Sequence, residues 1–324
     1  DLDTVFAGDG NDVVLGSTGR MNVFAGEQAD WVEGSRHADL LQGDNANQFQ
    51  NDVIGGNDVV IGRGGDDDIE GEGGDDILVG EWFGTDRHLG NMGYDWITYY
   101  GETASVDADL LFTVLQRPDV TAVRDRYDQL EAVSGGSGND VIRGLGREPD
   151  GTEGVDPALH KMTEDTINLV DGLRTMLSPP NHDNYALRFM AAGPVTDTDG
   201  ISNLLIGGPG SDTIEGRPGD DFIDGDAMLR VQLGLVEPGT ENVIERQNSA
   251  AGFSQRIFAG QIKPGDIRIL RDLVYEGSAG ATDTAVYGFP MAQYAIQDLG
   301  DGYYSVSHTL GDGEAEESEG SDVV

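Results

Sequence analysis

The chain has 324 residues, of which 60 are Asp or Glu and 19 are Lys or Arg, so its formal net charge is −41. Such an acidic chain excludes a nucleic-acid backbone as the main partner, because phosphate binding requires a basic face. The 49 glycines are too many for an ordinary helical or doubly wound domain, and the lack of cysteine excludes disulfides, thiolate metal sites and a cysteine nucleophile.

Residues 1–80 contain a nine-residue repeat of acidic and aliphatic positions. Asp12, Asp30 and Asp39 lie nine residues or a multiple of nine apart, and an aliphatic residue follows each of them two positions later. The acidic positions of this first block are Asp3, Asp12, Asp30, Asp39, Asp58, Asp67 and Asp76, and Met21 stands where the series would place another acid. A fixed period of this kind is typical of a solenoid.

Residues 71–79 are one of the fullest copies and show how a unit is built, with glycines first and a short apolar segment second. Glycine permits positive φ, so the first half forms a tight turn whose carbonyl oxygens point into the turn. The second half is a short strand whose aliphatic eighth residue points inward. Two units complete one coil, so residues 18 apart stack at about 4.8 Å, the spacing of neighbouring strands.

Between residues 81 and 133 the repeat gives way to a strand and loop segment. One copy is recognisable at 90–98, with Asp95 at the acidic position, and an alternation typical of a strand follows at 106–114. A second block of the roll is expected at 134–226, with full copies at 135–143 and 207–215.

The second block is interrupted at 146–200, where the sequence predicts an amphipathic helix. Asp156 is suited to the N-cap and Pro157 to the first turn. The apolar residues that recur on one helical face are Leu159, Met162, Leu169, Leu173 and Met176. We expect this helix to pack against its own domain.

Residues 227–324 predict a small α+β cap on the roll. A helix is expected at 248–260, a strand at 266–275, and two or three strands at 284–307 with a hairpin turn at Asp301 and Gly302. A cap has a physical reason, since the last coil of a solenoid would otherwise expose its apolar core and unpaired strand edges.

Carboxylates that stack from coil to coil predict metal sites. The stacked pairs are Asp12 with Asp30, Asp58 with Asp76, and Asn203 with Asp221. Bare carboxylates would repel one another, whereas Ca²⁺ accepts about six to eight oxygen ligands from carboxylates and backbone carbonyls together. We therefore expect several Ca²⁺ ions between adjacent turns; the alternative is an acidic solenoid with solvated aspartates and no ions.

The expected ligand positions include glycines of the turns as well as the acidic residues. They are Asp3, Gly8, Gly10, Asp12, Asp30, Asp39, Asp58, Gly65, Asp67, Gly74, Asp76, Asp95, Gly136, Gly138, Asp140, Asn203, Gly208, Gly210, Asp212, Gly219 and Asp221. Met21, Gln28 and His37 depart from the repeat pattern in the middle turns of the first block.

The repeat units resemble the glycine-rich nonapeptide of RTX (hemolysin-type) proteins, which binds Ca²⁺ in a parallel β-roll. The expected fold is therefore mainly β: an RTX solenoid in two blocks, with a helical insertion and a small α+β C-terminal cap. The resemblance implies export through a type I secretion channel and folding on Ca²⁺ at the cell surface or outside the cell. The partners it implies are calcium ions, an upstream domain of the same polypeptide and the secretion machinery, with no membrane span.

Segments outside the repeats resemble the C-terminal region of bacterial secreted proteins that join an animal-type haem peroxidase domain to RTX repeats. The segments are 93–98, 106–110, 124–128, 221–229 and 258–265. That family usually has an aromatic residue where Met228 stands. The resemblance implies that the parent protein is a haem peroxidase whose catalytic domain lies upstream of this chain.

No catalytic motif is recognisable in the sequence. The five histidines are scattered without the i, i+3 or i+4 pairing of a metal site, and nucleophile-elbow, phosphate-loop and zinc-helix motifs are absent. We expect a structural, calcium-binding chain that is not itself an enzyme. Two alternatives stay open: the tail of a secreted peroxidase, and a calcium-dependent adhesin or surface-layer component that assembles on the cell surface.

Overall fold

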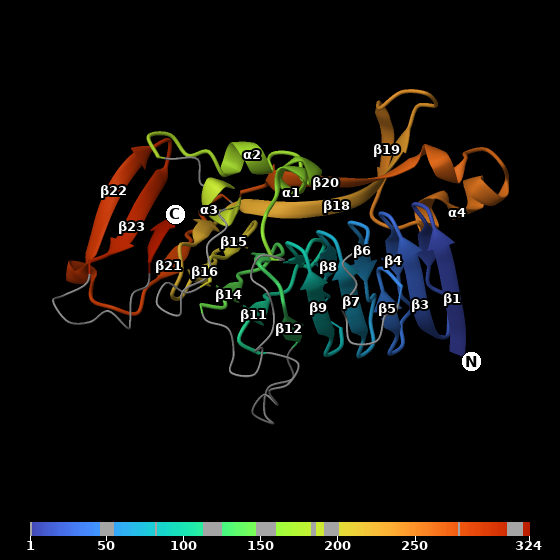
Figure 1. Cartoon of the computed structure of the whole chain (residues 1–324), viewed down its shortest axis with the longest axis horizontal. Coiled ribbons are helices and arrows are strands. Elements are labelled where there is room, and N and C mark those ends of the chain that lie inside the picture. The colour runs from blue at the N-terminus through green and yellow to red at the C-terminus, as the bar shows by residue number, and fades with distance from the viewer. Residues whose placement is uncertain are drawn as a thin grey trace.

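The computed structural model describes residues 2–45, 55–81, 83–112, 125–146, 160–182, 186–190, 201–277, 279–309 and 320–324. In these residues the chain winds into a long parallel β-roll, with its N-terminal end on the right in Figure 1. Short strands alternate between two sides of the roll, and each strand pairs in parallel with the strand one coil further on.

One side of the roll is a single eleven-stranded sheet, here called the long sheet. In spatial order its strands are β2 (Val13–Leu15), β4 (Trp31–Glu33), β6 (Val59–Ile61), β8 (Ile77–Val79), β10 (Trp96–Thr98), β13 (Ala132–Ser134), β15 (Leu204–Ile206), β17 (Phe222–Asp224), β24 (Ser321–Val323), β23 (Tyr303–His308) and β22 (Tyr294–Gly300).

The other side of the roll consists of two sheets. The six-stranded sheet has the order β1 (Leu2–Asp9), β3 (Arg20–Glu27), β5 (Leu40–Gln42), β7 (Asp68–Gly73), β9 (Arg87–Met92) and β12 (Arg126–Asp128). The four-stranded sheet has the order β11 (Asp107–Asp109), β14 (Val141–Arg143), β16 (Thr213–Glu215) and β21 (Thr284–Val286).

The central residues of the short strands fill the inside of the roll. Val32, Val60 and Leu78 from the long sheet join Leu41 and Ile69 from the six-stranded sheet in one core, and all five are fully buried. Because side chains alternate along a strand, each three-residue strand contributes one residue to this core. The aliphatic eighth position of the repeat therefore forms the interior, as the period predicts.

The long sheet is covered on its outer face as well. The covering sheet consists of β19 (Val243–Gln247), β18 (Ala227–Val236) and β20 (Ile267–Tyr275), and in Figure 1 β18 and β20 run along the roll. Trp31, Ile77 and Trp96 share a second core with Leu233 of β18 and Phe253 of α4 (Ala251–Phe258). Strands buried on both faces are apolar at successive positions, which explains why β8 reads Ile-Leu-Val.

Residues 81–133, where the repeat is irregular, supply β9 to β13 and leave the long sheet continuous. β10 pairs with β8 on one side and with β13 on the other. On the opposite side of the roll the chain order is exchanged, because β12 pairs with β9 whereas the earlier strand β11 pairs with β14. The Tyr127 amide donates to the Phe112 carbonyl across this junction at 2.8 Å.

The single helix predicted in the 146–200 insertion is wrong in its described part. Asp156, Pro157 and Leu159 lie outside the described residues, and the chain then forms α1 (Glu164–Leu169) and α2 (Leu173–Met176). Thr163 is the N-cap of α1 and forms a capping box with Thr166. Gly172 has a φ of +92° and separates the two helices. A third helix, α3 (Ala186–Met190), follows, and all three belong to the outer core.

Residues 227–324 lie in two places. The covering sheet and α4 lie along the roll, whereas β21 to β24 lie at its C-terminal end, where β24 pairs with β17. Two 3₁₀ turns, η2 (Pro264–Asp266) and η3 (Met291–Gln293), precede β20 and β22. The hairpin expected at Asp301 and Gly302 joins β22 to β23. None of the helices in the described ranges has the length and apolarity needed to cross a bilayer.

Candidate metal centre

A ladder of carboxylates runs along the long sheet, one rung in each coil. The amide of each rung residue donates to the side-chain carboxylate of the next rung at 2.6–2.8 Å. The rungs of this long-sheet ladder are Asp12, Asp30, Asp58, Asp76, Asp95 and Glu131, and each stands directly before its strand. The 18-residue step between Asp58 and Asp76 is the one that the sequence predicts.

Two further ladders run along the other side of the roll, with donor to acceptor distances of 2.7–3.0 Å. On the six-stranded sheet the amide of Met21 donates to Asp39, and the series continues through Asp67, Asp86 and Asp125. On the four-stranded sheet the amide of Val106 donates to Asp140, and the series continues through Asp212 and Asp283.

The second oxygen of the ladder carboxylates has no protein donor at many rungs. The buried Oδ2 atoms without a hydrogen-bond partner belong to Asp12, Asp30, Asp58, Asp67, Asp76, Asp95 and Asp212. This oxygen faces the turn of its own coil, since a Cβ added to Gly71 would lie 2.3 Å from Oδ2 of Asp76. Buried acceptors without a donor are costly, so each of these oxygens requires a cation or a proton.

Burial and neighbouring rungs oppose ionisation of the ladders. Burial is the largest cause of each of these shifts, and a neighbouring carboxylate of the same ladder adds to it. The pKa is raised to about 8 for Asp30 and Asp86 and to about 7 for Asp67 and Asp212. At the centre of the long-sheet ladder the pKa values of Asp58 and Asp76 are raised well above the usual range.

The donor set suits a hard cation that takes backbone ligands. Among the described residues no three carboxylate or imidazole side chains converge on one point. An ion in these turns would therefore combine carboxylate oxygens of adjacent rungs with carbonyl oxygens of the glycine turns. Ca²⁺ accepts such mixed oxygen sets in flexible geometry, whereas Mg²⁺ requires a stricter octahedron.

The predicted glycines lie in turns that pack closely against the neighbouring coil. Positive φ occurs at Gly8, Gly10, Gly65, Gly74, Gly208 and Gly219. At Gly136, Gly138 and Gly210 an added Cβ would lie within 2.8 Å of a carbonyl oxygen. Gly74 meets both conditions, because its φ is +122° and an added Cβ would lie 1.6 Å from the Gly56 oxygen.

Two of the predicted acidic or amide positions stand apart from the ladders. Asp3 is exposed and pairs in register with Met21, so no carboxylate lies below it; its Oδ2 instead accepts from the Ser17 hydroxyl at 3.0 Å. The side chain of Asn203 accepts from the Leu145 amide at 2.8 Å, so it does not receive the amide of the preceding rung. Asn203 still donates its own amide to Asp221 at 2.7 Å, as the 18-residue step predicts.

The sequence reasoning missed several rungs. Asp86 lies 19 residues after Asp67, and the same one-residue lengthening separates Asp95 from Asp76. A search with a step of 19 would have found Asp86. Asp125, Glu131 and Asp283 were also missed, as was Asp322, whose Oδ1 accepts from the Asp221 amide at 2.9 Å. Each lies 36 to 101 residues from its stacked partner, so no local spacing marks it.

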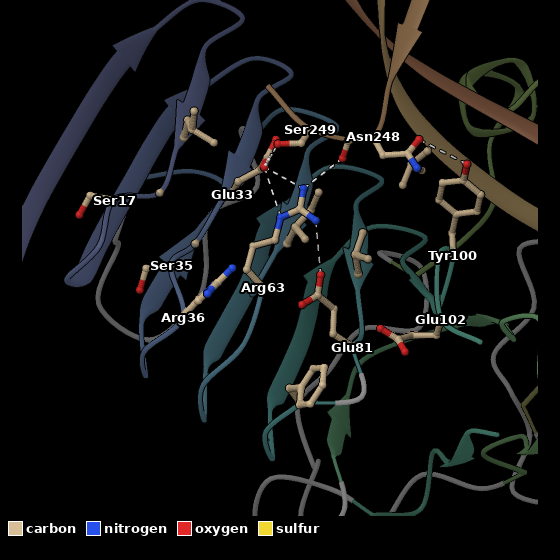
Figure 2. A pocket seen from close by; sticks show the side chains of 18 residues that line it. Ser17, Glu33, Ser35, Arg36, Arg63, Glu81, Tyr100, Glu102, Asn248 and Ser249 are labelled. Atoms are coloured by element: carbon tan, nitrogen blue, oxygen red, sulfur yellow. Dashed lines mark hydrogen bonds and ion pairs between the residues drawn. The ribbon is translucent and has the colours of Figure 1, made fainter. Parts of the chain in front are cut away.

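A polar cleft of about 600 Å³ lies beside the turns that leave the long sheet (Figure 2). Its centre is Glu33, whose side chain is almost fully buried and accepts from Arg63 and Ser249 at 2.7 Å and from the Ala250 amide at 2.6 Å. Arg63 also lies 3.6 Å from Glu81. These contacts join the roll to the segment before α4, so we assign Glu33 an anchoring role.

Comparison with known families identifies the repeats. Four copies of the RTX calcium-binding nonapeptide repeat match, at residues 2–20, 52–83, 131–146 and 197–227. Searches of the curated proteins and of the solved structures found no match. RTX nonapeptide repeats bind Ca²⁺. The matched segments include ladder rungs of all three sheets, and the chain therefore carries RTX calcium-binding repeats and folds as a parallel β-roll.

Proposed function

We propose that this chain is a calcium-folded structural module of a secreted protein. The observation that carries the proposal is the set of three carboxylate ladders, in which the buried Oδ2 atom lacks a protein donor at many rungs, among them Asp30, Asp58 and Asp76. The ladder aspartates, together with carbonyl oxygens of turns such as Gly71 to Gly74, would hold Ca²⁺ between successive coils. The ion supplies the positive charge that lets buried carboxylates ionise without repelling one another.

The same chemistry supports folding outside the cell. With a net charge of −41, the calcium-free chain experiences strong self-repulsion. Calcium that binds only the folded form shifts the equilibrium towards that form by mass action. A chain that stays unfolded at cytosolic calcium concentrations suits export through a type I secretion channel, and millimolar calcium outside the cell would then fold it.

The role of the module in a larger protein rests on sequence resemblance. The segments similar to secreted haem peroxidases with RTX repeats support a parent enzyme whose catalytic domain lies upstream, with this chain as its spacer or folding aid. Assembly on a cell surface is the competing proposal, and it predicts ordered multimers that form only with calcium.

Circular dichroism of the whole chain tests the proposal. Above about pH 8, where the metal-free ladders are ionised, the strand signal should appear on addition of millimolar CaCl₂, disappear with excess chelator and return when calcium is restored, while MgCl₂ at the same concentration should be much less effective. An identical strand signal with calcium and with chelator would contradict the proposal. A haem absorbance band in the same sample would instead support a direct part in peroxidase chemistry.

A further inference from the structure

Arg271 of the covering sheet reaches the edge of the long-sheet ladder. It is 8 % exposed, and its Nη2 donates to the backbone carbonyl of Asn57, the residue just before the rung Asp58. Its Nε is buried and has no hydrogen-bond partner. A guanidinium retains its charge in proteins, so a positive charge lies buried at this edge.

The charges around Arg271 are those of two ladder rungs. Burial lowers the pKa of Arg271 to about 10, and the carboxylates of Asp58 and Asp76 oppose this change. In return, Arg271 acts to lower the pKa of Asp76, although burial still holds that pKa well above its usual value. A buried guanidinium bound to the peptide carbonyl just before Asp58, with the Asp58 and Asp76 carboxylates acting on it, occupies an electrostatic position comparable to that of an ion in the ladder.

The backbone around Arg271 is held in place by the helical insertion. The Asp171 amide donates to the Arg271 carbonyl at 2.8 Å, and the Leu273 amide donates to the Asp171 carbonyl at 2.9 Å. The insertion also touches the ladder edge, since the Thr166 hydroxyl donates to Oδ2 of Asp75 at 2.6 Å. Two covering elements therefore meet at the turns that carry Asp58 and Asp76.

We propose that Arg271 is a built-in counter-ion for the Asp58 and Asp76 rungs and that the covering sheet thereby takes part in the charge balance of the calcium ladder. This inference rests on the proposed function and adds a residue outside the repeats to it. Arg271 acts as a positioning residue: it supplies a fixed positive charge beside the Asp58 and Asp76 rungs and links binding there to docking of β20.

A double-mutant cycle on the full chain tests the inference. Thermal midpoints are measured at one calcium concentration that folds the wild type, and again after chelation. Arg271→Met should lower the midpoint by roughly 2–6 °C in calcium. Arg271→Lys keeps the charge and should recover part of the loss. The matched control is Arg268→Met, which removes the same charge from an exposed residue of the same strand and should leave the midpoint nearly unchanged.

The decisive comparison uses Asp76→Asn, which removes the charge of one rung and keeps its shape. In that background Arg271→Met should lower the thermal midpoint clearly less than in the wild type, because one of the two carboxylates that Arg271 faces is no longer charged. An equal cost in both backgrounds would show that Arg271 only fills space, and would overturn the inference. If chelation of calcium left the wild-type thermal midpoint unchanged, the proposed function would be refuted instead. The same mutant cycle would still decide the role of Arg271.

Discussion

Removal of calcium should make the stability of the folded chain depend steeply on pH. The folded-state pKa values of Asp30 and Asp86 are raised from the usual 3.8 to about 8, and those of Asp67 and Asp212 to about 7. A group whose folded pKa lies above its unfolded value favours the fold at low pH. Its contribution is fully present below about pH 3.8 and is lost as the pH rises through 7 to 8.

The size of this effect decides whether the metal-free roll can exist at neutral pH. One pKa unit corresponds to about 1.4 kcal/mol, so ionising the four carboxylates in the folded chain would cost on the order of 15–20 kcal/mol. The net stability of a typical domain is only about 5–15 kcal/mol. The metal-free chain should therefore protonate its ladders or unfold, and above pH 8 it should unfold.

The assay is the strand signal in circular dichroism, recorded on metal-free protein between pH 4.5 and pH 8.5 and repeated with calcium. We expect the signal to fall with rising pH without calcium and to persist with calcium. Asp30→Asn combined with Asp86→Asn should flatten the metal-free curve, whereas Asp9→Asn with Asp301→Asn, both exposed, should not. Metal-free protein that is equally or more stable at pH 8 than at pH 5 would refute the reasoning.

Other substitutions test individual parts of the account. Gly71→Ala should lower both the thermal midpoint and the number of bound calcium ions, because the new Cβ would lie 2.3 Å from Oδ2 of Asp76. The control Gly265→Ala should change neither, because no atom lies within 4 Å of its added Cβ. Glu33→Ala should reduce the free energy of unfolding in urea by about 3–5 kcal/mol, since it leaves buried donors and Arg63 without their acceptor. Asp86→Asn should lower the calcium stoichiometry measured by titration calorimetry, and an unchanged stoichiometry would remove Asp86 from the ligands.

The repeat register could be predicted because it is set locally. Eighteen residues complete a coil, so the stacking of Asp12 on Asp30 and of Asp58 on Asp76 follows from counting. Asp86 was not predicted, because one inserted residue lengthens the step from Asp67 to 19 residues. Asp86 could have been found in the sequence by a search that accepted a step of 18 or 19 residues.

The position of the covering sheet could not be read from the repeat. Its contacts join residues far apart in the chain, such as Leu229 of β18 with Ser134, and no local period encodes them. One indication was available: β6 and β8 are apolar at all three positions, whereas β7 begins with alternating Asp, Ile and Glu. Strands with two apolar faces require cover on both sides, which is where the structure places β18 and β20.

The central claim is that the carboxylate ladders hold calcium between coils. Crystals of the full chain grown in millimolar CaCl₂ would test it through anomalous scattering from the bound ions. The account predicts a row of peaks along the turns that carry Asp12, Asp30, Asp58 and Asp76, each within about 2.3–2.6 Å of carboxylate and carbonyl oxygens. Well-ordered turns without any anomalous peak would contradict it.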